Sequence, residues 1–416
     1  MVRFSAKSRH LCALIVAVAT SATAQSPARS AAVRDSAGIR VVDNPRPAWP
    51  AGTGWTLSTT QALSIGPGGG APYAFARIAA ATRLSDGRIV VAERAAHELR
   101  YFDATGRHLT TVGRKGQGPG EFTDIGTVMR LPGDSLAVES LRYTSIFAPD
   151  GRFVRQVRYG PFDPEIVEVP FVAVIGRFPD GTAVVGDFPQ GRRGPRGAAR
   201  WIDSSSLFLV QANGAVNRFL ERVPAVAYGA AVNAPTPLTF GPEMVHASAA
   251  GHLYLGFSDQ HVIRQYDASW ALRRIIRRAW TPRPLSQVDL DRYVDSWMSM
   301  WSKETGVRRE RDRLAQLNAP YPDALPAFAD LLASPSGVLW LREPDLTRAA
   351  TCACLSAEPL TPSTWSVFDA DGVWLGRSNM PARFTPTEVG EDYVLGYARD
   401  ANEALRVVMY RIVKSK

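Results

Sequence analysis

The feature that most constrains this chain is a short polar turn, followed by an apolar strand, that recurs six times. The clearest copy is Asp86-Gly87, which precedes the apolar run Ile89 to Ala92. The other five turns are Gly133-Asp134, Asp180-Gly181, Ala250-Gly251, Ser336-Gly337 and Glu391-Asp392. Their spacing fits units of about 40 to 50 residues with insertions in the third, fourth and fifth, a period typical of propellers.

The first unit has the complete sequence pattern of a four-stranded antiparallel meander, and its second turn recurs in later units but is degraded in the fourth. In the first copy, Arg83 to Glu93 is typical of strand, turn and strand, Leu99 to Gly106 of a third strand and turn, and Leu109 to Gly113 of a fourth strand. With 416 residues, of which 45% are hydrophobic, the chain can bury a large core, which excludes a disordered protein. We therefore predict an all-β, six-bladed β-propeller.

The sixth unit lacks one strand of its own. It begins near Phe384 and has room for three strands, the last within Leu405 to Val413. An extended run before the first unit, Trp55 to Leu57 and Ala62 to Ile65, is the obvious donor of the fourth. Because an open ring leaves two unpaired sheet edges, we expect this segment to close the sixth blade. The alternative is a loose N-terminal arm.

The first residues are typical of an export signal. A basic segment, an apolar segment and a small-residue cleavage site follow one another: Arg3, Lys7 and Arg9, then Leu11 to Ala19, then Ala22-Thr23-Ala24. We predict a signal peptide at 1–24, an N-terminal extension at 25–54, a propeller at 55–416 and an exported protein, periplasmic or extracellular. The alternative, an uncleaved anchor, needs roughly 20 apolar residues, and neither this run nor a later one in the mature chain is long enough.

Charge and cysteine content limit the partners. Loss of the signal peptide removes three cations, so the formal net charge falls from +9 to +6. Because no nucleic-acid recognition motif accompanies this positive charge, we expect no nucleic-acid partner. Cys352 and Cys354 are the two cysteines of the mature chain, either bridged in a tight ring or free in a loop. A zinc site would need two more ligands nearby.

One stretch has helical periodicity. Within Ser286 to Leu317, apolar side chains recur at helical spacing at Leu290, Tyr293, Val294, Trp297 and Trp301. Prolines on both sides delimit a helical insertion at about 282–325 in the fourth unit. The aromatic stripe is either the packed face of an amphipathic helix or a lid over the propeller channel.

One connection resembles a known group. The run Gly113 to Phe122, Gly-Arg-Lys-Gly-Gln-Gly-Pro-Gly-Glu-Phe, resembles the link between consecutive blades in exported bacterial six-bladed β-propellers related to the NHL-repeat group. The opening Asp35 to Val42 and the closing Asp392 to Gly396 are similar too. The resemblance implies a propeller fold, and because the group includes binding proteins, lyases and hydrolases, it leaves the reaction open.

The loop after each second strand contains an acid, and in related proteins that loop opens at one end of the channel. The six acids are Glu93, Glu139, Asp187, Asp259, Glu343 and Asp400. If several converge, they could hold Ca²⁺, which would polarise a carbonyl or activate water. Alternatively, each accepts backbone N–H groups in its own turn.

Six residues break the repeat symmetry and are further candidates: Arg94, Arg142, His97, His246, His252 and His261. His261, which closely follows Asp259, is the first to test. No Gly-x-Ser-x-Gly nucleophile elbow occurs. We predict a binding module that takes a small molecule, carbohydrate or peptide at the channel mouth; a metal-dependent lactone hydrolase or lyase and a protein-interaction scaffold are the alternatives. Neither enzymatic activity nor oligomeric state follows from these residues.

Overall fold

The computed structural model describes residues 30–140, 143–166, 172–189, 191, 194–195, 198–230, 235–301, 306, 308–310, 314, 318–346, 359 and 361–414. The predicted signal peptide, Arg142, Cys352 and Cys354 lie outside these residues.

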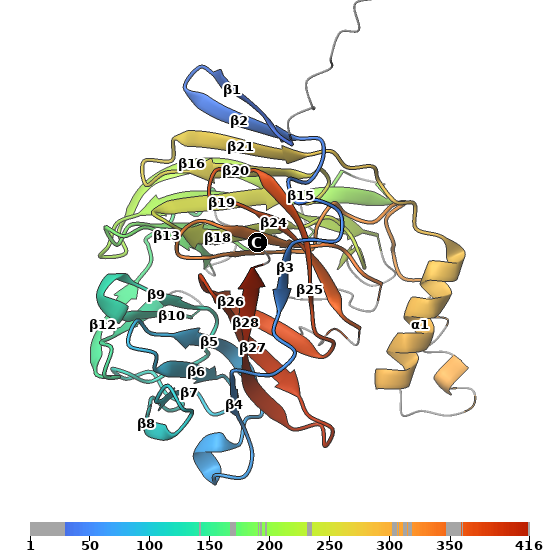
Figure 1. Ribbon diagram of the computed structural model, residues 1–416. Helices are drawn as coiled ribbons and strands as arrows, with labels where there is room; N and C mark the ends of the chain where they lie inside the picture. The colour runs from blue at the N-terminus through green and yellow to red at the C-terminus, as the bar shows by residue number, and fades with distance from the viewer. Residues whose placement is uncertain are drawn as a thin grey trace, which may run out of the picture.

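Within the described residues the strands form six sheets that fan around one centre (Figure 1). Blade 1 holds β5 (Ile78–Arg83), β6 (Ile89–Glu93), β7 (Glu98–Phe102) and β8 (His108–Val112). Blade 2 holds β9 (Val128–Arg130), β10 (Leu136–Ser140), β11 (Tyr143–Phe147) and β12 (Phe153–Arg158). Blade 3 holds β13 (Val172–Arg177), β14 (Ala183–Asp187), β15 (Arg200–Val210), β16 (Val216–Gly229) and β17 (Thr236–Pro237).

The second half repeats the plan. Blade 4 holds β18 (Met244–Ala249), β19 (His252–Phe257), β20 (Val262–Tyr266) and β21 (Leu272–Arg278). Blade 5 holds β22 (Asp330–Ala333), β23 (Leu339–Arg342), β24 (Ser363–Phe368) and β25 (Trp374–Met380). Blade 6 holds β26 (Phe384–Val389), β27 (Tyr393–Arg399), β28 (Leu405–Lys414), β3 (Trp55–Leu57) and β4 (Leu63–Ile65). Two short 3₁₀ turns are η1 (Ala71–Tyr73) and η2 (Pro132–Asp134).

The apolar core lies between successive blades. One cluster joins blades 1 and 2 through Tyr101, Phe122 and Phe147, and corresponding clusters join every later pair. A further cluster joins blade 6 to blade 1 through Leu395 and Val91. Because each blade buries both faces against a neighbour, the ring is closed and the prediction of six blades is confirmed.

Closure depends on the N-terminal segment, as predicted. β3 pairs antiparallel with β28, with Thr56 opposite Val413, and β4 pairs with an earlier part of β28, with Ser64 opposite Val408. Leu63 and Ile65 are buried in the core between blades 6 and 1. The segment therefore supplies the missing outer strand.

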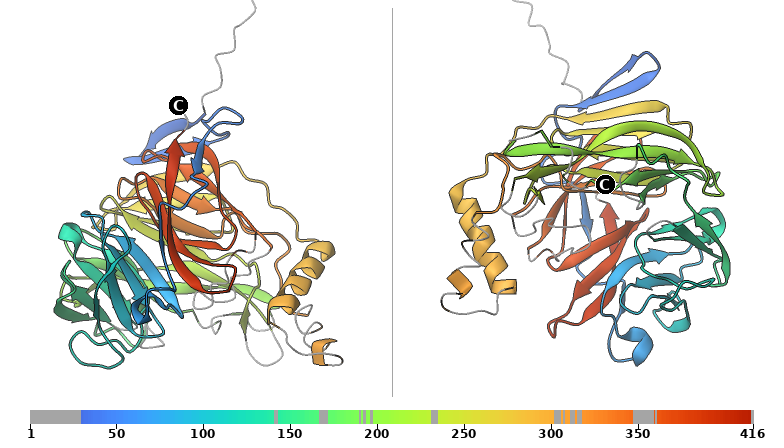
Figure 2. Two further views of the ribbon diagram at one scale, coloured as in Figure 1. Left: turned by 60° about the horizontal axis from the view of Figure 1, so that its bottom comes forward. Right: turned by 180° about the vertical axis from the view of Figure 1, so that it is seen from behind.

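An N-terminal hairpin extends blade 4. β1 (Ala32–Ser36) pairs with β2 (Ile39–Asn44), and β2 runs parallel to β21 (Figures 1 and 2). Asn44 fixes the attachment: its amide donates to the carbonyls of Arg277 (2.9 Å) and Gly372 (3.0 Å), and its Oδ1 accepts from the Trp374 N–H (2.8 Å). The buried side chain of Asn44 thus connects the hairpin to both blade 4 and blade 5.

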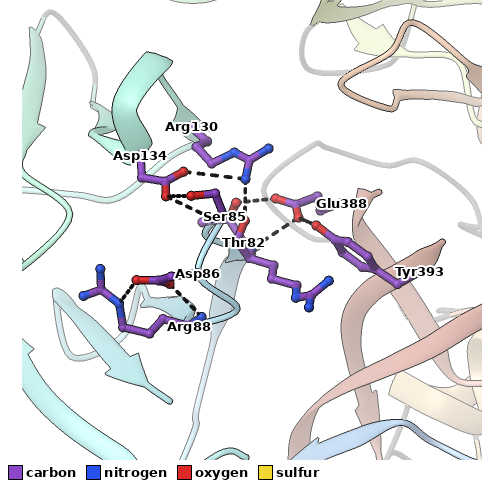
Figure 3. Close-up of polar contacts among 9 residues, drawn as sticks. Thr82, Ser85, Asp86, Arg88, Arg130, Asp134, Glu388 and Tyr393 are labelled. Carbon is purple, nitrogen blue, oxygen red and sulfur yellow. Dashed lines mark hydrogen bonds and ion pairs between the residues drawn. The ribbon is translucent and has the colours of Figure 1, made fainter. Parts of the chain in front are cut away.

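Polar side chains also link blades at the first turns (Figure 3). Ser85 in blade 1 donates its N–H (2.9 Å) and hydroxyl to Asp134 in blade 2. Ser336 in blade 5 donates both groups to Glu391 in blade 6 at 3.0 and 2.9 Å. At the closing junction Glu388 accepts from the Thr82 hydroxyl, the Arg83 N–H and the Tyr393 hydroxyl. The same turns that mark the repeat in the sequence therefore fasten neighbouring blades.

The insertion in the fourth unit contains helix α1 (Gln287–Trp301), which stands beside the sheets (Figure 1). Ser286 caps it, because its Oγ accepts from the Asp289 N–H (3.2 Å) while Asp289 accepts from the Ser286 N–H (3.1 Å). Tyr293 and Val294 pack against Phe240. The buried side of α1 is therefore a packed face; the side chains of Trp297 and Trp301 lie outside the description. Among the described helices, none has the length and apolar character needed to cross a bilayer.

Candidate ligand-binding site

A cleft of about 330 Å³ opens between blades 3 and 4. Its wall on blade 3 is one stretch of β16, and its floor and rim come from β18, β19, β20 and the loop after β19. The residues that line it are Glu221, Arg222, Val223, Pro224, Met244, Leu255, Gly256, Phe257, Asp259, Gln260, Val262, Arg264 and Tyr266. An apolar floor thus carries a rim of both charges.

The blade 3 wall follows from an irregular strand pair. β15 and β16 pair over most of their lengths, but the register shifts between Asp203 and Ser204 and again between Leu207 and Phe208. Such bulges add twist to a hairpin. The stretch Glu221 to Pro224 lies between these two shifts in the pairing and lines the cleft with four consecutive residues.

The rim on blade 4 is a tied loop. Ser258 exchanges bonds with Glu243, because its N–H donates to the Glu243 carbonyl and its Oγ accepts from the Glu243 N–H, both at 3.0 Å. Its own carbonyl accepts from the Ala327 N–H at 2.7 Å. Asp259 and Gln260, which follow, are exposed on this fixed loop. The loop therefore presents two polar side chains to the cleft from a rigid base.

Tyr266, which lines the cleft, stacks on Trp270 behind it. Tyr266 and Trp270 lie 4.1 Å apart between centroids, with 9° between their planes. The Trp270 Nε1 donates to Glu221 Oε1 at 3.0 Å, which joins the blade 4 turn to the blade 3 wall. The stacked pair is thus braced across the junction of the two blades.

Two titratable groups of the cleft, Asp259 and Tyr266, have pKa values that are shifted by partial burial. Burial raises the pKa of Asp259, and the positive charge of Arg264 opposes that shift. Burial likewise raises the pKa of Tyr266. Arg222 makes a long contact from Nε to the Ser206 hydroxyl (3.4 Å). Two carboxylates and two guanidinium groups therefore share one small cleft.

His261, the first candidate from the sequence, is a buried packing residue. Its ring lies 5.4 Å from that of Phe328 and 5.9 Å from that of Phe368. Burial, aided by Arg278, lowers its pKa to about 3, so the imidazole is neutral at pH 7. Its Nε2 has no hydrogen-bond partner among the described residues. It shares a loop with Asp259 but does not line the cleft.

Glu343 belongs to a second polar cluster, between blades 4 and 5. Its Oε1 lies 2.5 Å from Arg278 Nη1 and accepts from the Ser366 hydroxyl at 2.6 Å. Burial would raise the pKa of Glu343, but the hydrogen bonds from Arg278 hold it below its ordinary value. Arg278 also lies over the Trp374 ring, 4.8 Å from its centroid. The hydrogen-bond acceptors of Glu343 are therefore occupied by side chains of the protein itself.

Glu139 is saturated in the same way between blades 2 and 3. Arg177 Nη2 lies 3.1 Å from its Oε1, and the hydroxyls of Thr144 and Tyr159 donate to its Oε2. Burial raises the pKa of Glu139 against the opposing charge of Arg177. The group is an ion pair between two blades, and Glu139 is not among the residues that line the cleft between blades 3 and 4.

Three other acids accept backbone N–H groups, within the same turn at Asp400 and from a segment that lies farther away in the sequence at Glu93 and Asp187. Glu93 accepts from the Arg77 N–H at 2.9 Å, and Asp187 from the Ser206 N–H at 2.6 Å. Asp400 accepts from the Asn402 N–H at 2.9 Å and the Ala404 N–H at 3.1 Å. These carboxylates hold loops in place and do not point to a shared ligand.

The remaining candidates lie apart from the cleft. Arg94 forms a two-pronged ion pair with Asp124, at 2.7 and 2.5 Å. His246 is half-buried, and loss of water around its ring lowers its pKa, while His252 contacts the Ala250 carbonyl at 2.9 Å. His97 holds a left-handed backbone conformation, with φ of 60°.

The calcium interpretation does not fit this arrangement. In the part of the chain that the structure describes, no three His, Cys, Asp or Glu side chains gather closely enough to hold a metal ion. The six loop acids are distributed around the ring, one to a blade, and five are engaged by neighbouring backbone or side-chain groups. We derive no metal-dependent step from them.

Comparison with known proteins agrees with this architecture. Residues 78–129 match a family described as a 6-bladed beta-propeller. The chain is a six-bladed β-propeller. This propeller is similar to a protein from Bacteroides fragilis described as a candidate exported protein, with 11% identity, a TM-score of 0.51, and coverage of 90% of this chain and 100% of that one.

A second solved structure has comparable similarity to the propeller. It is a member of the DUF4221 family from Bacteroides vulgatus, with 10% identity, a TM-score of 0.51, and coverage of 87% of this chain and 99% of that one. No curated protein matches. At these identities the likeness shows the fold alone, and the relation to the NHL-repeat group stays a prediction.

Sequence reasoning identified one part of the cleft and missed the other. Asp259 was found because it follows the second strand of blade 4. The wall at Glu221 to Pro224 was missed, because these residues lie inside a long outer strand and not in a loop. Pro224 within a strand was an available signal, since proline in a sheet favours an edge or a bulge.

Proposed function

We propose that this propeller is an exported binding module that takes a small polar molecule, a short carbohydrate or a short peptide in the cleft between blades 3 and 4. The observation that supports it is the cleft itself: an apolar floor at Met244 and Phe257 beneath the charged side chains of Asp259 and Arg264. Concave sites with an apolar lining and a few placed polar groups are the usual form of small-ligand sites.

The proposal moves the expected site from the channel mouth to an interblade cleft. The rim of the proposed site is the loop after the second strand of blade 4, and the opposite wall comes from the neighbouring blade. Export rests on the predicted signal peptide at 1–24, with the mature chain beginning at Gln25.

A ligand screen with a cleft-blocking variant tests this function. The mature protein is screened by thermal shift against a panel of metabolites, oligosaccharides and short peptides, and hits are measured by calorimetry. Gln260→Trp places a bulky ring at the cleft from an exposed position and should weaken binding of a true ligand at least 10-fold. The matched control is Asn402→Trp, on the corresponding exposed loop of blade 6.

The proposal fails if no compound in the panel raises the melting temperature, or if Gln260→Trp binds the hits as tightly as the control does. A bound ligand stabilises the folded state by mass action, so binding at 100 times Kd should add about 2.7 kcal/mol.

A further inference from the structure

We infer that the cleft takes a small zwitterion, a free α-amino acid or a dipeptide, whose ammonium group meets the acids and whose carboxylate meets the arginines. The inference rests on the proposed function of the cleft. The four charged residues that carry it are Glu221, Arg222, Asp259 and Arg264, and all four are exposed at the lining. Two charges of each sign match a ligand that carries both signs and no net charge.

The donor and acceptor chemistry fits those two ends. Guanidinium groups pair with carboxylates through two parallel N–H bonds, which suits Arg264 and Arg222 to a terminal carboxylate. Arg222 uses only Nε in its contact with Ser206. Glu221 binds Trp270 through Oε1, which leaves Oε2 as the oxygen for a ligand donor. An ammonium group, with three donors, suits Asp259 together with that oxygen.

The other polar junctions of the ring show which cation an acid here attracts. Between blades 4 and 5, Glu343 holds the guanidinium of Arg278, and between blades 2 and 3, Glu139 holds that of Arg177. In blade 4 the acid that follows the second strand, Asp259, faces the cleft instead. Glu139 and Glu343 each pair with an arginine of a neighbouring blade, whereas Asp259 faces the cleft with only the charge of Arg264 of its own blade acting on its pKa, so a ligand cation can approach its carboxylate.

Size and apolar surface narrow the class. At about 330 Å³ the cleft is near the lower limit for ligand sites, which span roughly 300 to 1,000 Å³, so an amino acid or a dipeptide fits and a long oligosaccharide does not. Met244, Phe257 and Val262 offer an apolar floor for one ligand side chain. We expect ligands with an aliphatic side chain to bind best.

Blocking each end of the ligand tests the inference. Calorimetry compares the free dipeptide Ala-Leu, its N-acetyl derivative and its C-terminal amide, beside a panel of free amino acids and neutral disaccharides. Each block should weaken binding at least 10-fold, about 1.4 kcal/mol. Asp259→Asn should lower the affinity for the free dipeptide but leave the affinity for the N-acetyl derivative unchanged. Arg264→Gln should lower the affinity for the free dipeptide but leave the affinity for the C-terminal amide unchanged. Asp323→Asn, whose side chain is 92% exposed outside the cleft, is the control.

The outcomes separate this inference from the proposed function. Two results would overturn the zwitterion but not the binding cleft. One is equal affinity for free and blocked peptides. The other is tightest binding of a neutral disaccharide, provided that Gln260→Trp weakens that binding. If no probe binds, or if binding survives Gln260→Trp, both proposals fail.

Discussion

At the residue scale, one aspartate organises the turn between β20 and β21. Asp267 accepts from the N–H groups of Ser269 (2.9 Å) and Ala271 (3.0 Å) and pairs with Arg273 at 2.6 Å. In three other turns an aspartate also accepts from the N–H groups two and four residues later: Asp103, Asp369 and Asp400. In the fourth blade this turn carries Trp270, which holds a positive φ of 65° and stacks on Tyr266.

The pKa of Asp267 predicts the pH at which its contribution to the free energy of unfolding is lost. Although burial acts to raise this pKa, hydrogen bonds from Ser269, Ala271 and Arg273 lower it from 3.8 to about 2. A carboxylate with a lowered folded-state pKa stabilises the fold above its unfolded pKa, and this stability disappears as the pH falls through the folded value. Asp267→Asn should therefore cost about 1 kcal/mol at pH 7 and almost nothing at pH 2.

Urea unfolding at pH 7, 4 and 2 measures that difference. Asp323→Asn removes only an exposed surface ion pair with Arg200, so it should change the free energy of unfolding by less than about 0.5 kcal/mol at every pH. A cost for Asp267→Asn that stays constant from pH 7 to pH 2 would contradict the role of its ionised form.

At the element scale, the short strand β4 should contribute more to stability than the longer hairpin strand β1. Ile65 is 1% exposed in the core between blades 6 and 1, whereas Val33 is 50% exposed on β1. Ile65→Ala should lower the free energy of unfolding by about 3 kcal/mol, because it leaves a cavity at the closing junction. Val33→Ala should change it by less than about 0.5 kcal/mol. Equal midpoints in urea for the two variants would disprove the closing role of β4.

The elements that the sequence predicted are those with local signals. Asp86-Gly87 fixes the first turn because Gly87 has a φ of 91°, a conformation that glycine adopts at no steric cost, and Asp86 accepts from the Arg88 N–H. Trp55 to Ile65 was placed because ring closure required a strand. The hairpin β1–β2 was not, since its partner β21 follows it by more than 200 residues and the two pair in parallel.

The candidate site was only half predictable for the same reason. Asp259 lies in a loop that the repeat identifies, but the wall at Glu221 depends on how β16 twists against a neighbouring blade. The sequence made His261 a candidate for ligand binding, but in the structure it is a neutral side chain that is buried against Phe328 and Phe368. Sequence alone gives no measure of which way a loop side chain turns.

At the scale of the whole molecule, the mature chain should be a propeller without its first 24 residues. Produced as the full 416-residue chain in a Gram-negative host, it should be recovered outside the cytoplasm with Gln25 as its first residue. N-terminal sequencing and intact mass measure this. Ala24→Asp should block cleavage, while Ser30→Asp, beyond the cleavage site, should not. An intact N-terminus in the cytoplasmic fraction would sink the prediction of export.

The N-terminal arm crosses three blades whose strands all come much later in the chain. β2 pairs with β21, the N–H groups of Ala48 and Trp49 donate to Trp374 and Leu375 in β25, and β4 pairs with β28. During synthesis or passage through a translocon, the segment that emerges first must wait for the segment that emerges last. The arm can therefore complete its pairing only after β21, β25 and β28 have been synthesised, and until then the chain remains open enough to pass through a translocon.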